Sequence, residues 1–171
     1  MDEIASLLEP QIPGLRRYAW ALLRDDEAAD DLVQDTLERA LRHWGQRRDG
    51  DLKAWLFAIQ RNLFLNAVRQ RKARGVHVGV EMLEEASADA ADAHAADAHV
   101  GLRDILAGLD ALPEEQRSVL LLVGVEDLTY EQVAQVLDIP IGTVMSRLSR
   151  ARGKLREFME YGRNAVLRRV K

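Results

Sequence analysis

The sequence predicts an all-α protein made of two small helical domains joined by a flexible linker, with a helix-turn-helix in the C-terminal domain. Apolar residues recur at three- and four-residue spacing along most of the 171 residues, which is typical of amphipathic helices. The sequence lacks runs of alternating β-branched residues, which would indicate strands. The sign of the charge also alternates along the chain in blocks. We therefore expect a first domain over residues 1–74, a linker over 75–100 and a second domain over 101–171.

The charge blocks follow the order acidic, basic, acidic, basic. Residues 1–51 carry twelve acids and seven bases, and residues 52–80 carry six bases and no acid. Residues 81–138 carry fourteen acids and two bases, whereas residues 139–171 carry nine bases and two acids. A chain with a net charge of −4 that concentrates its cations in two places is expected to have two kinds of partner, each selected by one charge sign.

Composition argues against several classes of protein. The chain has no cysteine, which excludes disulfides, cysteine-ligated zinc and thiol catalysis and is typical of a reducing cytosol. The N-terminus shows no signal peptide, and the longest apolar run, residues 119–125, is far too short to span a membrane. No glycine-rich phosphate loop or His/acid constellation is present. We expect a cytoplasmic protein that is not an enzyme and needs no cofactor or metal.

In the first domain, a helix is expected to begin near Asp25 or Asp26. Its inward positions are apolar: Ala29, Leu32, Val33, Leu37, Ala40 and Leu41. Its outer side is acidic and polar: Asp31, Gln34, Asp35 and Glu38. Such a face is often only solvated, so these residues alone do not establish a binding site.

A longer amphipathic helix follows, in "DLKAWLFAIQRNLFLNAVRQRKAR". The predicted core residues are Trp55, Leu56, Ile59, Leu63 and Val68. The predicted polar positions are Gln60, Arg61, Asn62, Asn66, Arg69 and Arg71. Amides, arginines and nearby aromatics are the side chains that hold unstacked bases and their phosphates, so this helix is a candidate site for single-stranded nucleic acid.

The predicted linker is rich in Ala, Asp and Gly and has few large apolar residues, so it can hardly form a core. It contains the repeat "ADAHA" and "ADAHV", which places His94 and His99 five residues apart. Helical metal-ligand pairs need a spacing of three or four, so we interpret the segment as a solvated linker whose Ala-rich end joins the next helix. Beyond it, Leu102, Ile105, Leu106 and Leu109 form a helical stripe.

The C-terminal domain continues with a helix that starts at Pro113, with Glu114 and Glu115 at its positive end, and then with two further helices. Thr129 is the predicted N-cap of a short helix with a capping box to Gln132, and Pro140 belongs to the turn or to the first position of the next helix. The inward residues are listed by helix: Val133, Ala134, Val136 and Leu137, then Val144, Leu148, Ala151 and Leu155. A face about 110° away presents Thr143, Ser146, Arg147, Arg150 and Lys154. This is the layout of a DNA-binding helix-turn-helix.

Three stretches carry a family resemblance: "DDLVQDTLERAL", "AWLFAIQRNLFLNAVRQRK" and "ALPEEQRSVLLLVGVEDLTYEQVAQVLDIPIGTVMSRLSRARGKLRE". With their spacing they cover most of residues 12–158. The chain resembles a bacterial RNA polymerase sigma factor of the extracytoplasmic-function (group four, sigma-70 superfamily) type. The resemblance implies two helical domains, and it implies that core RNA polymerase, promoter DNA and an anti-sigma factor are the partners.

The resemblance also implies site residues. Asp31, Gln34, Asp35 and Glu38 would dock on the clamp helices of the polymerase largest subunit. The melted −10 element would be held by Trp55, Arg61, Asn62, Asn66, Arg69 and Arg71. The −35 element would be contacted by Thr143, Ser146, Arg147, Arg150 and Lys154. The chain departs from the family pattern at Asn66, where many relatives have an acid, which leaves the −10 base preference open. It also departs at Asp138, where glycine is common; Asp tolerates such a turn.

Two other functions remain open. A sigma-like mimic would sequester an anti-sigma factor without binding promoters, but it would not need the cations Arg147, Arg150 and Lys154. An ordinary helix-turn-helix repressor would leave "DDLVQDT" and the basic helix unexplained.

Overall fold

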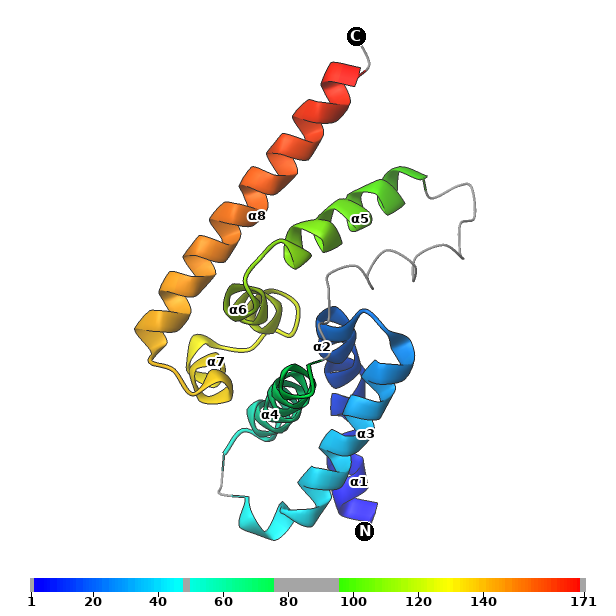
Figure 1. Cartoon of the computed structure of the whole chain (residues 1–171). Helices are drawn as coiled ribbons and strands as arrows, with labels where there is room; N and C mark the ends of the chain where they lie inside the picture. Colours follow the sequence, from blue (N-terminus) through cyan, green and yellow to red (C-terminus); the bar gives the residue numbers. More distant parts are fainter. Residues whose placement is uncertain (1, 48–49, 76–95, 170–171) are drawn as a thin grey trace. The chain divides into compact units, whose positions relative to one another are not determined.

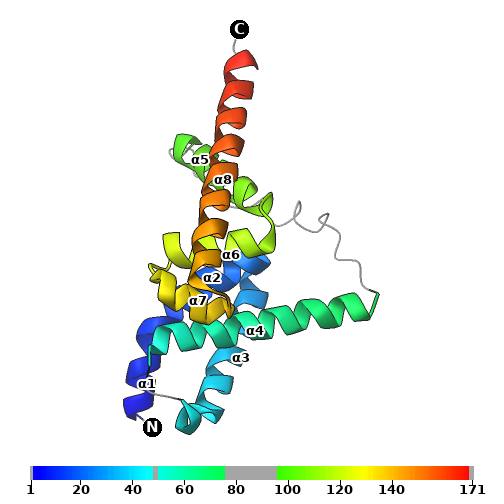
Figure 2. The same cartoon turned by 90° about the vertical axis from the view of Figure 1, so that its left-hand side faces the viewer.

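The computed structural model describes residues 2–47, 50–75 and 96–169, and within these ranges it contains helices and turns only. The elements in chain order are α1 (Asp2–Leu8), η1 (Glu9–Gln11), α2 (Ile12–Leu23), α3 (Asp26–Arg42), η2 (Trp44–Gln46), α4 (Leu52–Ala73), α5 (Ala96–Asp110), α6 (Glu114–Gly124), α7 (Tyr130–Leu137) and α8 (Ile141–Arg169). The predicted all-α class is confirmed. The two longest helices, α4 and α8, each run without interruption (Figure 2).

The helices divide into two compact units (Figure 1). Unit 1 contains α1 to α4, and its backbone contacts also assign to it the segment Glu131–Asp138, which contains most of α7. Unit 2 contains α5, α6 and α8. We predicted a second domain over residues 101–171 that includes α7, and this boundary stays a prediction.

The core of unit 1 forms where α2, α3 and α4 pack on one another. Leu15 and Tyr18 of α2 and Phe57 of α4 are almost completely buried, and the two rings meet edge to face with centroids 5.5 Å apart. The Gln60 side-chain amide donates a hydrogen bond of 3.0 Å to the Leu15 carbonyl oxygen. This bond joins α4 to α2 inside the core.

Aspartates cap the two helices that carry the predicted sites of unit 1. Asp25 has an extended backbone and accepts a 2.7 Å hydrogen bond from the Ala28 amide, so α3 begins where the sequence predicts. Asp51 caps α4 in the same way by accepting from the Ala54 amide at 3.0 Å. These caps satisfy amides that the first turn of a helix leaves without partners.

Two predicted inward faces of unit 1 need correction. On α3, Leu41 is 50% exposed, whereas the buried side includes Thr36, whose hydroxyl donates to the Leu32 carbonyl oxygen at 2.7 Å. On α4, Leu56 is buried as predicted, but Trp55, Ile59, Leu63 and Val68 are only half-buried. The buried positions of α4 are Ala54, Leu56, Phe57, Gln60, Arg61 and Phe64. The predicted stripe was wrong because it excluded two polar residues that the core accommodates.

In unit 2, α8 packs against both α6 and α5. Val119, Leu122, Val144, Leu148 and Ala151 are buried. Helix α6 starts directly after Pro113 and has Glu114 and Glu115 in its first turn, as predicted.

The contact between α5 and α8 depends on a glycine. A Cβ atom added at Gly108 would lie 2.5 Å from Leu155 Cδ1 and 3.1 Å from Phe158 Cδ1. The predicted stripe of α5 is buried only near this contact, at Leu109, whereas Leu102 and Ile105 are exposed.

Most of the predicted linker lies outside the described residues, including His94 and the first half of the repeat. Its last residues, 96–100, form the start of α5, which agrees with the expectation that the Ala-rich part joins the next helix. Among the described helices, none has the length and apolar character needed to cross a membrane.

The core of unit 1 predicts the cost of one substitution. Phe57→Ala removes a buried ring and its edge contact with Tyr18, and we expect it to lower the free energy of unfolding by about 3–5 kcal/mol. Leu41→Ala, on the exposed side of α3, is the control and should change it by no more than ~0.5 kcal/mol. Urea unfolding followed by circular dichroism measures both. Equal losses for the two variants would contradict this core.

Candidate nucleic-acid and protein interfaces

A tight turn precedes α8, the helix that carries the predicted −35 face. Asp138 adopts a left-handed backbone with φ of 52°, as the sequence predicts for an Asp that replaces glycine there. Pro140 ends the turn, and its carbonyl oxygen accepts from the amides of Thr143 at 2.9 Å and Val144 at 3.2 Å. Since α7 begins directly after Thr129, the chain has the predicted sequence of short helix, tight turn and long helix.

The predicted division of α8 into an inward and an outward face agrees with its burial. Ser146, Arg150 and Lys154 are exposed, and Thr143 and Arg147 are half-buried at the border with the buried stripe. The Ser146 hydroxyl donates to the Thr143 carbonyl oxygen at 3.1 Å. The five predicted −35 residues therefore share one side of α8.

Arg147 has an acidic neighbour that the sequence did not indicate. Its Nη2 atom lies 3.4 Å from Oε2 of Glu115, in the first turn of α6. The Arg147 side chain is 21% exposed and that of Glu115 is 64% exposed. The two residues are far apart in sequence, so only the packing of α6 on α8 brings them together.

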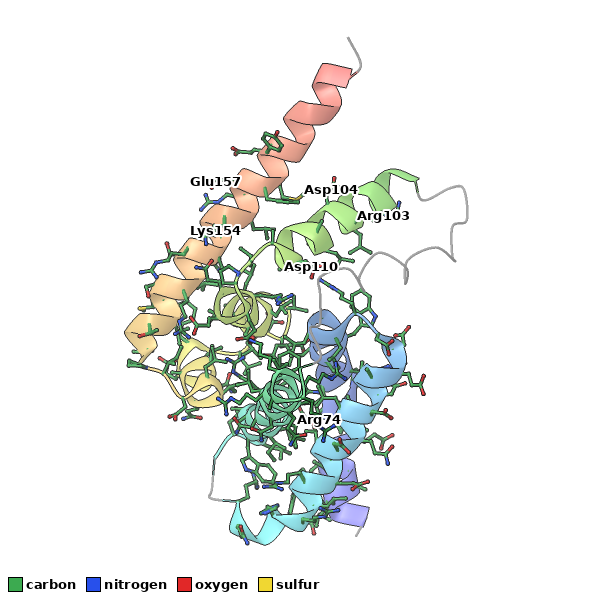
Figure 3. The ribbon with its side chains drawn as sticks, viewed as in Figure 1. Arg74, Arg103, Asp104, Asp110, Lys154 and Glu157 are labelled. Atoms are coloured by element: carbon green, nitrogen blue, oxygen red, sulfur yellow. The ribbon has the colours of Figure 1, made fainter. Side chains whose placement is uncertain are left out.

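The flank of α8 on the other side of the buried stripe is also cationic. A groove of about 320 Å³ lies there, lined by Tyr130, Met145, Leu148, Ser149, Arg152 and Arg156. Figure 3 labels other charged residues of this unit, Lys154 and Glu157 on α8 and Arg103, Asp104 and Asp110 on α5. Unit 2 thus presents a polar cationic face and a mixed apolar and cationic groove on separate sides of one helix.

The predicted polymerase-binding residues lie together on α3. Asp31, Gln34, Asp35 and Glu38 are all exposed. The Gln34 side-chain amide donates to Glu38 Oε1 at 3.3 Å, and Arg42 Nη2 lies 3.4 Å from Glu38 Oε2. Glu38 is thus engaged within α3, whereas Asp31 and Asp35 point into solvent with no ion pair among the described residues.

The predicted −10 residues do not form a single face. Asn62, Asn66, Arg69 and Arg71 are exposed on α4, but Arg61 is only 7% exposed. Arg61 lies between the buried residues Phe57 and Phe64, one helical turn away on either side. Its expected contact with DNA is therefore not supported by the geometry, because the residue is buried in unit 1.

An aromatic cluster lies at the start of α4. Trp55 is half-buried and meets Trp44 of η2 edge to face, with ring centroids 6.1 Å apart. The Arg47 guanidinium lies 5.3 Å from the centroid of the Trp44 ring. The sequence analysis named Trp55 but not its two neighbours. The tryptophan and the two arginines in "HWGQRR", a few residues before Trp55, were the available signal.

Comparison with known proteins gives matches in both halves of the chain. Residues 8–60 match the family model described as the sigma2 domain of PhyR, and residues 102–155 match the model of sigma-70 region 4. The chain is 39% identical over 156 residues to the ECF RNA polymerase sigma factor EcfG of Rhodopseudomonas palustris, covering 90% of this chain and 83% of that protein. It is 28% identical over 149 residues to the ECF sigma factor SigM of Bacillus subtilis, covering 86% and 90%.

Solved structures agree with these matches. The sigma factor RpoE of Bartonella quintana, in complex with the anti-sigma factor NepR, superposes with a TM-score of 0.77 at 31% identity, covering 94% of this chain and 98% of that one. The anti-anti-sigma factor PhyR of the same organism, complexed with NepR, gives a TM-score of 0.58 at 14% identity, covering 90% of this chain and 49% of that one. The second likeness shows a shared fold only.

The burial of Arg61 leads to a test of its role. Arg61→Ala should lower the free energy of unfolding by about 1–3 kcal/mol, because the interaction that this buried side chain makes is lost. Asn62→Ala, the exposed neighbour, should change it by no more than ~0.5 kcal/mol. Thermal and urea unfolding of the two variants measure the difference. If the Arg61→Ala protein is as stable as the wild type but binds promoter DNA poorly, the predicted contact of Arg61 with the −10 element is supported instead.

Proposed function

This chain belongs to the extracytoplasmic-function (ECF) family of RNA polymerase sigma factors, and we propose that its faces on α3, α4 and α8 bind core polymerase, the −10 element and the −35 element. Sigma factors are transcription initiation factors and not enzymes, so RNA synthesis belongs to the polymerase. The observation that carries the proposal is the cationic side of α8, which lies within the match to sigma-70 region 4. We place the protein in the cytoplasm, where the polymerase acts.

The residues of α8 support contact with duplex DNA. A helix that follows a tight turn can enter the major groove with the side chains near its N-terminus. Thr143, Ser146 and Arg147 lie in its first two turns, and Arg150 and Lys154 extend the same face. An arginine can read guanine through two hydrogen bonds, whereas the ammonium group of Lys154 is suited to a phosphate contact.

The exposed part of α4 supports contact with the melted strand. Asn62 and Asn66 offer amides for base edges, and Arg69 and Arg71 offer cations for phosphates. Trp55 lies nearer the start of the helix and retains an exposed part on which a base can stack. Arg61 is left out of this proposed surface because it is buried.

We also propose an anti-sigma factor as a partner. The sigma factor RpoE, which is 31% identical, was solved in complex with the anti-sigma factor NepR. Unit 2 of this chain has large apolar side chains that its own core does not cover, including Leu102 and Ile105 on α5 and Tyr161 on α8. Exposed apolar surface of this kind is expected where another protein binds.

A second function, that of a sigma-like mimic, has one observation in its favour. Residues 8–60 match the sigma2 domain of PhyR, and PhyR was solved as an anti-anti-sigma factor. The exposed cations of α8 favour the promoter-binding function, since a mimic has no use for them. The two functions differ in one assay: only a sigma factor lets core polymerase start transcription at specific promoters from a genomic library.

In that assay, Arg147→Ala combined with Arg150→Ala should reduce promoter-specific transcription while the protein remains folded. Each arginine that reads a guanine contributes ~1–3 kcal/mol, so we expect a loss of at least about tenfold. Arg103→Ala, which removes an exposed cation from α5, is the control and should transcribe normally. Full promoter-specific transcription by the double variant would refute the −35 assignment.

The acidic face of α3 predicts a separate defect. Gln34→Ala with Asp35→Ala should weaken binding to core polymerase, since both side chains are exposed beside the buried Leu32 and Val33. Their removal should change the free energy of unfolding by only ~0.5 kcal/mol. Titration of labelled protein with core polymerase measures the affinity, and Asp104→Ala on α5 is the charge control. Wild-type affinity of the double variant would exclude this face from the interface.

A further inference from the structure

The ion pair between α6 and α8 involves a residue of the predicted DNA-reading face. Arg147 Nη2 lies 3.4 Å from Glu115 Oε2, and the Arg147 side chain is largely covered. The other two cations of this face, Arg150 and Lys154, are exposed and make no ion pair with the described residues. Among the three, one arginine is therefore held in place and two are not.

The geometry leaves the held arginine able to bind DNA. The guanidinium has five N–H donors in a rigid plane, and the contact with Glu115 goes through Nη2. The donors on the remaining nitrogens stay available to a base edge. A guanidinium that is already oriented loses less rotamer freedom when it binds, so its hydrogen bonds discriminate better than those of a mobile side chain.

The carboxylate also changes how Arg147 interacts with phosphates. Non-specific binding to duplex DNA comes from cations that neutralise phosphates, and an acid beside a cation opposes that attraction. Glu115 is 64% exposed, so its charge acts on a nearby phosphate as well. The pair should therefore lower non-specific affinity while it favours a directed contact with a base.

We propose that Glu115 is a positioning residue for recognition of the −35 element, which orients Arg147 toward one base pair and limits its attraction to phosphates. This inference rests on the proposed function and adds to it a residue of α6, outside the helix-turn-helix. It concerns specificity: Glu115 acts through Arg147 and needs no contact with DNA of its own.

The test uses holoenzyme assembled from core polymerase and the full chain. Its probes are a labelled duplex promoter selected by the transcription assay, single-base variants across its −35 element, and a duplex with a scrambled −35 element. With Glu115→Gln, we expect discrimination against the mismatched base pair to fall roughly three- to tenfold. This is smaller than the discrimination that a complete bidentate base contact can provide. Affinity for the scrambled duplex should rise, and its salt dependence should become steeper.

Two further variants separate positioning from stability. Glu115 also stabilises the N-terminus of α6 by its charge, and Glu115→Asp keeps this charge but shortens the side chain. We expect Glu115→Asp to have the free energy of unfolding of the wild type but to lose base-pair discrimination to the same extent as Glu115→Gln. Asp104→Asn removes an exposed acid from α5, which packs near Leu155 and Phe158, two turns or more from Arg147, and it should change neither quantity.

A double-mutant cycle decides whether Glu115 acts through Arg147. In the Arg147→Ala background, Glu115→Gln should cause no further loss of discrimination. An equal loss in both backgrounds would mean that Glu115 contacts a base itself, for example the cytosine amino group, and would overturn the positioning role. Unchanged discrimination by Glu115→Gln would also overturn the positioning role. If Arg150→Ala loses discrimination in the same assay, the proposed function stands even though the positioning role has failed. Failure of the wild-type holoenzyme to distinguish the promoter from the scrambled duplex would overturn both.

Discussion

Burial of one apolar stripe on α8 determines what unit 2 can present to its partners. Val144, Leu148 and Ala151 must pack inward, mainly against α6, and this fixes the rotation of the helix about its axis. With that rotation fixed, the residues on one flank of the stripe become the cationic face and those on the other flank line the groove with Arg152 and Arg156. Because successive residues are about 100° apart around the helix, the proposed DNA-binding face and the groove consist of different side chains of α8.

A polar interaction has the corresponding role in unit 1. The hydrogen bond from Gln60 to the Leu15 carbonyl oxygen fixes the register of α4 against α2, since a shift of one residue would leave a buried amide without its acceptor. That register directs Asn62 and Asn66 outward and takes Arg61 inward. The surface that we propose for a melted strand thus depends on an amide that is itself buried in the core.

Local chemistry made parts of this structure predictable from sequence. The caps Asp25 and Pro113 mark the helix starts because their effect depends only on residues within one turn. The phase of α4 was mispredicted because an apolar stripe was assumed, whereas its buried side includes the polar residues Gln60 and Arg61, and Gln60 has its acceptor on a different helix, α2. The pairing of Glu115 with Arg147 could not be predicted, since it depends on how two helices distant in sequence pack together.

The missing side chain at Gly108 has an evolutionary consequence. Because a methyl group there would lie 2.5 Å from Leu155 Cδ1, the end of the Leu155 side chain would have to turn aside to admit it. A smaller residue at position 155 removes this conflict. Alanine at position 108 should therefore arise most readily in lineages in which position 155 has already become smaller, so substitutions at the two sites should be correlated.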